Sequence, residues 1–206
     1  MENKNIIIIG SGGHAKVVIE ALKSKYIQPM GIISNEITKG NKFCGIDVLG
    51  SDEELIKLEP EKYLLVNGIG HIPEKNDRLN VSKVIEQKKF NLYSVIHKET
   101  IISESAKLEN GVQVMAGVII QAGVTVGRNC IINTGVILEH DCEIGENTHL
   151  ASGSICCGNV IIGDNTFIGS GSTIIHGASI GSNCIIAAGS IVYKDIKDNN
   201  KLIQKI

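Results

Sequence analysis

The sequence predicts a small α/β domain followed by a parallel β-helix with three short strands in each coil. From Ile102 to Val192 every sixth residue is apolar, and the residue two positions before each of them is small or β-branched. A period of six fits no α-helix, whereas hexapeptide repeats are typical of parallel β-helices. Because side chains alternate along a strand, both registers point inward. The β-helix should therefore have a core of branched aliphatic side chains and small fillers.

A second period of eighteen indicates that three hexapeptides make one coil. The strings that begin at Val126, Ile144, Ile162 and Ile180 repeat one another, each with Gly next and Asn in its fourth place, and a set of glycines keeps the same step: Gly117, Gly135, Gly153, Gly171 and Gly189. Gly and Asn tolerate the positive φ of tight corners. We therefore predict a triangular prism.

The start of this period near residue 100 predicts two domains, residues 1–95 and 96–193, with residues 194–206 as a polar C-terminal tail. A formal net charge of −2 and 3% aromatic residues exclude a basic, stacking surface for nucleic acid. No apolar run is long enough to span a bilayer, and no charged and then apolar leader precedes the first strand. We expect a cytoplasmic protein that binds neither nucleic acid nor membrane.

The six cysteines predict no metal site. Four of them, Cys130, Cys142, Cys156 and Cys184, fall on the inward registers, where they act as small core residues. A zinc site would need ligand-spaced pairs with a nearby histidine. Disulfides are not expected in a chain without a leader.

Residues 1–95 are expected to alternate strands and helices, which implies a parallel, doubly wound, Rossmann-like sheet. The predicted elements are strands over 5–9, 29–33 and 63–66, helices over 15–24, from Ser51 and from Pro73 to about 87, and a closing strand over 92–96. Ser51 and Glu54 form a capping box for the second helix.

The turn after the first strand predicts a phosphate-binding loop. Gly10, Gly12 and Ala15 match G-x-G-x-x-A between a strand and a helix. Glycines let the backbone approach a pyrophosphate, and the helix N-terminus supplies free N–H groups. The acid that holds a ribose in dinucleotide enzymes is replaced by Ser34 and Asn35, which favours another phosphate-bearing ligand. The alternative is a turn that only packs the helix on the sheet.

A second glycine turn, at Gly68 and Gly70, follows the third strand at the edge where open α/β sheets bind ligands. Arg78, on the next helix, could reach a phosphate or simply lie in solvent. Taken alone, this turn does not distinguish between ligands.

Two histidines fall outside the inward registers, His140 at a corner and His149 on the outward register, where we expect it to face solvent. Nine residues separate them, which is half a coil, so one prism does not easily bring them together. Side-by-side packing around a symmetry axis would form a shared cleft, and this predicts a cyclic oligomer. His176 lies two coils beyond His140 at the same edge, about 10 Å away at ~4.8 Å per strand, with no assigned role.

The hexapeptide repeat, the strings over 131–135 and 139–145, and the turn Gly12-Gly13-His14 resemble one acyltransferase family. It comprises left-handed β-helix sugar acetyltransferases similar to the sialic-acid O-acetyltransferase and the bacillosamine-pathway UDP-amino-sugar N-acetyltransferase. The resemblance covers nearly the whole chain. It implies a left-handed parallel β-helix, acetyl-CoA as donor, a homotrimer, and a nucleotide-sugar acceptor in bacterial surface glycan biosynthesis.

The resemblance also implies roles for individual residues. His140 matches the general base and Asp141 the acid that orients it, while Asn133 lies beside the acceptor. The acetyl-CoA contacts would be His149, the N–H of Gly158, Ser170 and Ala188, and the nucleotide-sugar contacts would be Gly12, Gly13, His14, Ser34, Asn35 and Gly70. Histidine titrates near neutral pH and suits removal of the acceptor's proton, and a fixed N–H stabilises a carbonyl oxygen that gains charge. Direct transfer follows, because a core cysteine without a base is a poor nucleophile.

Two departures from the family pattern leave alternatives open. Ser34 and Asn35 stand where some nucleotide-sugar members have an acidic pair, and a Gly-x-Pro-Ala turn is missing near the C-terminal tail, so CoA contacts there are not predicted. An amino-sugar N-acetyltransferase is the leading interpretation. The alternatives are O-acetylation of a sialic-acid-type sugar, a nicotinamide-binding regulatory module, and a trimeric scaffold without activity.

Overall fold

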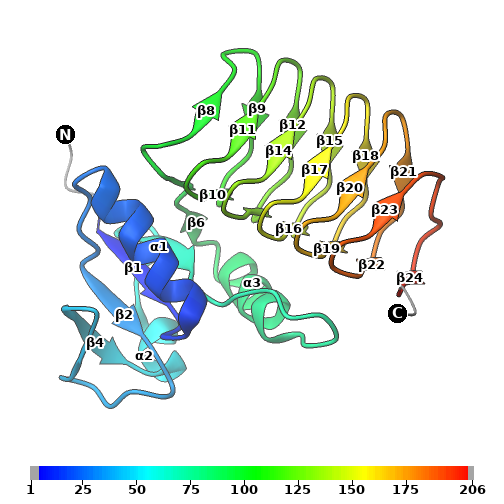
Figure 1. Ribbon diagram of the computed structural model, residues 1–206. Helices are drawn as coiled ribbons and strands as arrows, with labels where there is room; N and C mark the ends of the chain where they lie inside the picture. Colours follow the sequence, from blue (N-terminus) through cyan, green and yellow to red (C-terminus); the bar gives the residue numbers. More distant parts are fainter. Residues whose placement is uncertain (1–4, 204–206) are drawn as a thin grey trace. The chain divides into compact units, whose positions relative to one another are not determined.

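The computed structural model describes residues 5–203 of the chain and divides it into two compact units, one up to Val95 and one from Ile96. Figure 1 shows the first unit in blue to blue-green and the second in green to red. The first is a mixed α/β sheet with three helices, and the second is a parallel β-helix.

The sheet of the α/β unit has the strand order β3-β4-β2-β1-β5-β6. All neighbours pair in parallel except β3 and β4, which form a hairpin. The strands are β1 (Ile6–Ile9), β2 (Gly31–Ile33), β3 (Lys42–Phe43), β4 (Ile46–Gly50), β5 (Leu64–Asn67) and β6 (Asn91–Leu92). The strands predicted over 5–9, 29–33 and 63–66 are confirmed as β1, β2 and β5.

Sequence analysis missed the hairpin, whose two-residue turn is Cys44-Gly45. Both residues have positive φ, 50° and 84°. This geometry suits a two-residue hairpin, but its usual sequence signal is Asn-Gly or Asp-Gly. The hairpin makes the sheet mixed rather than wholly parallel.

The three helices are α1 (Gly13–Ser24), α2 (Asp52–Lys57) and α3 (Asp77–Gln87). Ser51 caps α2 by accepting a hydrogen bond from the backbone of Glu53, as the prediction of a cap at this residue requires. The Glu54 half of the predicted capping box is not found, because Glu54 Oε1 accepts from Lys57 instead. The predicted start of α3 at Pro73 is wrong, because the helix begins at Asp77 after a turn. The predicted closing strand over 92–96 is also wrong: it divides into β6 and β7 (Val95–Ile96), and β7 pairs in the β-helix.

The β-helix stacks two-residue strands into three parallel sheets, and each strand pairs with the one eighteen residues along, as Ile131 does with His149. The first sheet contains β7, β10 (Gln113–Val114), β13 (Ile131–Ile132), β16 (His149–Leu150), β19 (Phe167–Ile168), β22 (Ile185–Ile186) and β24 (Lys201–Leu202). The second contains β8 (Ile101–Ile102), β11 (Ile119–Ile120), β14 (Ile137–Leu138), β17 (Ile155–Cys156), β20 (Thr173–Ile174) and β23 (Ile191–Val192). The third contains β9 (Lys107–Leu108), β12 (Thr125–Val126), β15 (Glu143–Ile144), β18 (Ile161–Ile162) and β21 (Ser179–Ile180).

The predicted inward registers are confirmed. Residues from Val112 to Val192 on these registers form one core cluster, and Ile132, Leu138 and Ile168 in it are fully buried. The four core cysteines are buried and unbridged. The corners also match the prediction, since the repeated asparagines at 129, 147, 165 and 183 have φ of 55–57°.

The predicted tail from residue 194 departs from expectation within the described residues. Ile196 bridges Ile180, and β24 pairs with β22. The coil therefore continues to Leu202, and residues 204–206 lie outside the part of the chain that the structure describes.

Candidate active site

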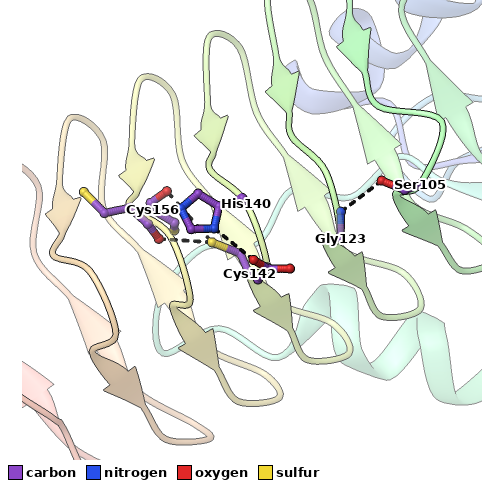
Figure 2. A network of polar contacts seen from close by, with 7 residues as sticks. Ser105, Gly123, His140, Cys142 and Cys156 are labelled. Carbon is purple, nitrogen blue, oxygen red and sulfur yellow. Dashed lines mark hydrogen bonds and ion pairs between the residues drawn. The ribbon is translucent and has the colours of Figure 1, made fainter.

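His140 lies on the turn that follows β14, with 54% of its side chain exposed. Its Nδ1 is 2.9 Å from Oδ2 of Asp141, whose φ of 59° turns the chain sharply at this corner (Figure 2). A carboxylate at Nδ1 holds the proton there and leaves Nε2 as the proton acceptor. The geometry therefore presents one basic nitrogen at the surface of the β-helix.

The His140 ring lies over Gly158, the residue at the same corner of the next coil. A Cβ at Gly158 would collide with Nε2 and Cε1 of the ring. The Gly158 carbonyl accepts a hydrogen bond of 3.0 Å from Gly177, whereas none of the backbone hydrogen bonds among residues 5–203 uses the Gly158 N–H. Within the described residues, the Gly158 N–H is thus left without a backbone partner at the residue over which the His140 ring lies.

His149, predicted to face solvent, is buried with 7% of its surface exposed, so this prediction is wrong. Its ring packs edge-on against Phe167, with centroids 5.1 Å apart. Its Nε2 is 3.2 Å from Nδ2 of Asn133 on the neighbouring coil. Outward side chains of adjacent coils stack on one another, and this stacking buried a ring that the register alone placed in solvent.

The α/β unit contains a cavity of about 770 Å³ at the carboxyl edge of its sheet. All six residues predicted to contact a nucleotide sugar line it: Gly12, Gly13, His14, Ser34, Asn35 and Gly70. The first turn of α1 opens on this cavity and carries no acidic residue. Unpaired N–H groups at such a helix start favour an anion.

Several polar side chains that line this cavity are hydrogen-bonded to one another. Ser11 and Ser34 share a hydrogen bond of 2.7 Å. Asn35 donates from Nδ2 to Oδ2 of Asp52 at 2.7 Å and accepts the Asp52 backbone N–H at 3.0 Å. Sequence analysis missed Asp52 as a lining residue, because the capping box at Ser51 located a helix start without showing that it borders the turn after β2.

Arg78 belongs to the structure of the second glycine turn. It is 2% exposed, and its Nη1 donates to the carbonyls of Asn67 at 2.9 Å and Ile69 at 2.7 Å. The solvated position considered for it is therefore wrong, and Arg78 is not among the residues that line the cavity. Burial, and then the charge of Arg78, lowers the pKa of the nearby His71 to about 4, so His71 is neutral at physiological pH.

Comparison with known proteins identifies the family. Residues 5–85 match the PglD N-terminal domain, residues 123–158 the bacterial transferase hexapeptide (six repeats), and residues 159–194 the hexapeptide repeat of succinyl-transferase. A histidine-to-asparagine variant of perosamine N-acetyltransferase from Caulobacter crescentus, solved with CoA and GDP-perosamine, is 34% identical over 97% of this chain and 93% of that chain, with a TM-score of 0.88. The chain belongs to the PglD-type family of hexapeptide-repeat sugar N-acetyltransferases. It is an acetyl-CoA-dependent sugar acetyltransferase.

Two further solved structures support the same fold. The acetyltransferase domain of PglB from Neisseria gonorrhoeae FA1090, in complex with acetyl coenzyme A, is 27% identical over 96% of this chain and 95% of that chain, with a TM-score of 0.85. WeeI from Acinetobacter baumannii AYE is 21% identical over 97% and 96% of the two chains, with the same TM-score of 0.85. A comparison with curated proteins gave no match.

Two core cysteines of this PglD-type acetyltransferase, Cys142 and Cys156, are poor nucleophiles. Cys142 follows His140 by two residues and points into the core, where its sulfur is 3.2 Å from the carbonyl of Cys157. Burial raises the pKa of Cys142 to about 11 and raises that of Cys156 as well. Both stay protonated at neutral pH, and a thiol is far less nucleophilic than a thiolate.

The remaining predicted residues of this acetyltransferase lie at another corner. Ser170 and Ala188 are exposed at equivalent places of adjacent coils, and the Ser170 carbonyl accepts a hydrogen bond of 2.8 Å from Gly189. Their small side chains leave this edge open. Among residues 5–203 no group of three or more His, Cys, Asp or Glu is arranged to hold a metal ion. The described helices include none that is long and apolar enough to cross a membrane.

Proposed function

We propose that the protein transfers the acetyl group of acetyl-CoA to the amine of a nucleotide-activated amino sugar, with His140 as general base. The observation that carries the proposal is the exposed His140 ring, tied to Asp141 through Nδ1 and lying over Gly158. The relative from Caulobacter crescentus binds CoA and GDP-perosamine, and the acetyltransferase domain of PglB binds acetyl coenzyme A.

The proposed chemistry is direct attack of the amine on the thioester carbon. His140 Nε2 takes a proton from the amine as the C–N bond forms, and Asp141 stabilises the resulting imidazolium. The Gly158 N–H donates to the carbonyl oxygen as it gains negative charge. The C–S bond then breaks, and the sulfur leaves as the thiol with the proton that His140 carried. The high pKa of Cys142 supports a route without an acyl-enzyme.

The cavity of the α/β unit is the proposed site for the nucleotide part of the acceptor. Its volume of about 770 Å³ suits a molecule of that size. The start of α1 would face the diphosphate, with Lys75 on the cavity wall as a positive partner. The Asn35–Asp52 pair and Glu36 supply acceptors for the donors of a ribose and a base.

A homotrimer that completes the acetyl-CoA site is part of the proposal. The outward face of the second sheet carries a ladder of five isoleucines that pair directly or through Thr173: Ile101, Ile119, Ile137, Ile155 and Ile191. Ile101 and Ile191 are 68% and 60% exposed. A continuous apolar strip of this kind is typical of an interface. This strip borders the turn that carries His140, so a second copy packed on it would enclose the half-exposed ring. The second copy would bring either the sheet that carries its own His149 or the corner that carries its own Ser170 close to that ring.

The test is thiol release from acetyl-CoA with UDP-, GDP- and dTDP-amino sugars and with CMP-sialic acid. We expect turnover with at least one amino sugar and a fall of about 10²–10⁴-fold in His140→Ala. His97→Asn is the matched control, since His97 lies at the first coil and its Nδ1 accepts a hydrogen bond from the backbone N–H of Glu99. Unchanged turnover in His140→Ala would overturn the role of the base, and turnover with sialic acid alone would favour O-acetylation.

A further inference from the structure

A second histidine, His176, shares the edge of the β-helix with His140. It lies on the turn after β20, two coils further along. The ring centroids of His140 and His176 are 6.2 Å apart and tilted by 48°. Two coils at about 4.8 Å per strand separate equivalent backbone positions by roughly 10 Å. The rings are therefore much closer than the repeat alone would place them.

Gly158 is the reason for this closeness. The three turns are stacked by two hydrogen bonds, from Asn159 N to the His140 carbonyl at 2.9 Å and from Gly177 N to the Gly158 carbonyl at 3.0 Å. The middle turn carries no side chain at residue 158, and the His140 ring fills that space. Both rings then face one stretch of exposed edge, at a separation that a single water molecule can bridge.

The proposed reaction needs a second proton acceptor. An aliphatic amine is mostly protonated at pH 7. The balanced transfer is R–NH₃⁺ + CH₃CO–SCoA → R–NH–COCH₃ + HSCoA + H⁺. The ammonium group loses two of its three protons in this reaction. One of them ends on the sulfur, and the other must leave the site. His140 cannot hold both, because it must be neutral when the C–N bond forms.

We propose that His176 accepts the first proton of the bound ammonium, through a water molecule or His140, and releases it to solvent. The ammonium N–H bond breaks to give the neutral amine, and His176 becomes an imidazolium. His140, again neutral, then takes the second proton during the attack and passes it to the sulfur. His176 is thus a proton-accepting residue that extends the pH range of the reaction, and this inference rests on the proposed amine acceptor.

Other titratable groups surround His176 on the stacked turns. His140 and Asp141 lie toward one end, Cys157 is on the intervening coil, and Tyr193, Lys194 and Asp195 lie toward the other end. Asp195 is held through Oδ1 by the backbone N–H of Ser179 at 2.9 Å, and the Lys194 ammonium lies 5.9 Å from the centre of the Tyr193 ring. Asp141 is bonded to His140. His176 is the second imidazole of this set, and its ring centroid lies 6.2 Å from that of His140.

The test compares kcat/KM of wild type, His176→Asn and the control His97→Asn from pH 6 to pH 9, with the amino-sugar acceptor found active. At pH 6.5 we expect His176→Asn to lose about tenfold, and at pH 9, where more of the acceptor is already neutral, to lie within about twofold of wild type. Added imidazole should restore the low-pH loss. Melting temperatures at both pH values check that the fold is kept.

Three outcomes separate the hypotheses. A loss in His176→Asn that is equal at every pH, or no loss at pH 6.5, overturns the role of His176 while leaving the amine acetyltransferase intact. A loss at low pH that imidazole does not restore also counts against proton acceptance. Absence of amine acetylation by the wild type overturns the proposed function itself.

Discussion

The two units build their sites in opposite ways. In the α/β unit, irregular turns enclose a cavity, and its polar side chains are already bonded to one another, as Asn35 is to Asp52. In the β-helix, a regular repeat presents His140 on an open edge, hydrogen-bonded to Asp141. The proposed binding site is thus enclosed within one unit, whereas the proposed general base is left half exposed.

The difference follows from the kind of backbone in each unit. An α/β sheet ends in loops that differ from one another, and a pocket forms between them. A β-helix repeats the same corner at every coil, so a site arises only where the repeat is broken by a particular residue. At the corner that carries His140, equivalent positions lie eighteen residues apart. In chain order they are occupied by Glu104, Ala122, His140, Gly158 and His176, so the repeat changes from His140 onward.

Gly158→Ala should have the largest effect on activity of the substitutions considered, because it adds a side chain at the position that the His140 ring now covers. Its Cβ would collide with the His140 ring and turn Nε2 away from the edge. We expect kcat to fall by about 100-fold or more, since a small displacement of a base costs a large factor in rate. The melting temperature should change little, because the His140 ring can move into solvent. Activity close to that of the wild type would show that the ring position over Gly158 is not the reactive one.

Ile137→Glu tests whether the reactive edge needs a second copy. Ile137 lies in the middle of the isoleucine ladder, and a buried, unpaired carboxylate at an interface costs several kcal/mol. We expect sedimentation to show a smaller species and activity to fall as the protein is diluted. The control is Ile161→Lys, on the third sheet, where 47% exposure and the directly paired Glu143 make a positive charge tolerable. A trimer that persists in Ile137→Glu would place the interface elsewhere.

The β-helix was largely predictable because its signal is repeated. Each inward position is specified by the same rule as its neighbours eighteen residues away, so Ile132, Leu138 and Ile168 were correctly placed in the core. The burial of His149 was not predictable in this way. It depends on which outward side chain stands next to it on the adjacent coil, here Phe167 and Asn133.

The α/β unit was predictable in its strands and its glycine turn, since strong local patterns mark both. The hairpin at Cys44-Gly45 and the late start of α3 were not, because the chain there adopts turns without their usual residues. The cavity residues Asp52 and Lys75 come from segments that meet only in the folded sheet. The short distance between the His140 and His176 rings was likewise not predictable, because it depends on the His140 ring lying over Gly158.

His71 offers the contrasting case of a histidine that is partly buried in the α/β unit. Its pKa of about 4 lies below the ordinary value near 6.5, so below pH 6.5 the unfolded chain binds a proton that the folded chain does not. Stability is therefore lost as the pH falls from 6.5 toward 4. We expect urea unfolding of the wild type to lose about 1 kcal/mol more between pH 6.5 and 5 than that of His71→Asn, after allowance for solvent screening. His97→Asn should keep the wild-type slope, and equal slopes in all three would exclude His71 as the source.

Asn165, at a corner of the β-helix, gives the prediction with the smallest expected effect. Its φ of 55° lies in the left-handed region, which costs an ordinary L-residue free energy that glycine does not incur. Asn165→Ala should lower the unfolding free energy by about 0.5–1 kcal/mol, and Asn165→Gly should change it by only a few tenths. Both are measured by urea unfolding at neutral pH, with kcat unchanged because the corner is remote in register from His140. If Asn165→Gly were as destabilising as Asn165→Ala, the asparagine side chain rather than the backbone angle would stabilise the corner, and the repeat would depend on side-chain contacts as the α/β pocket does.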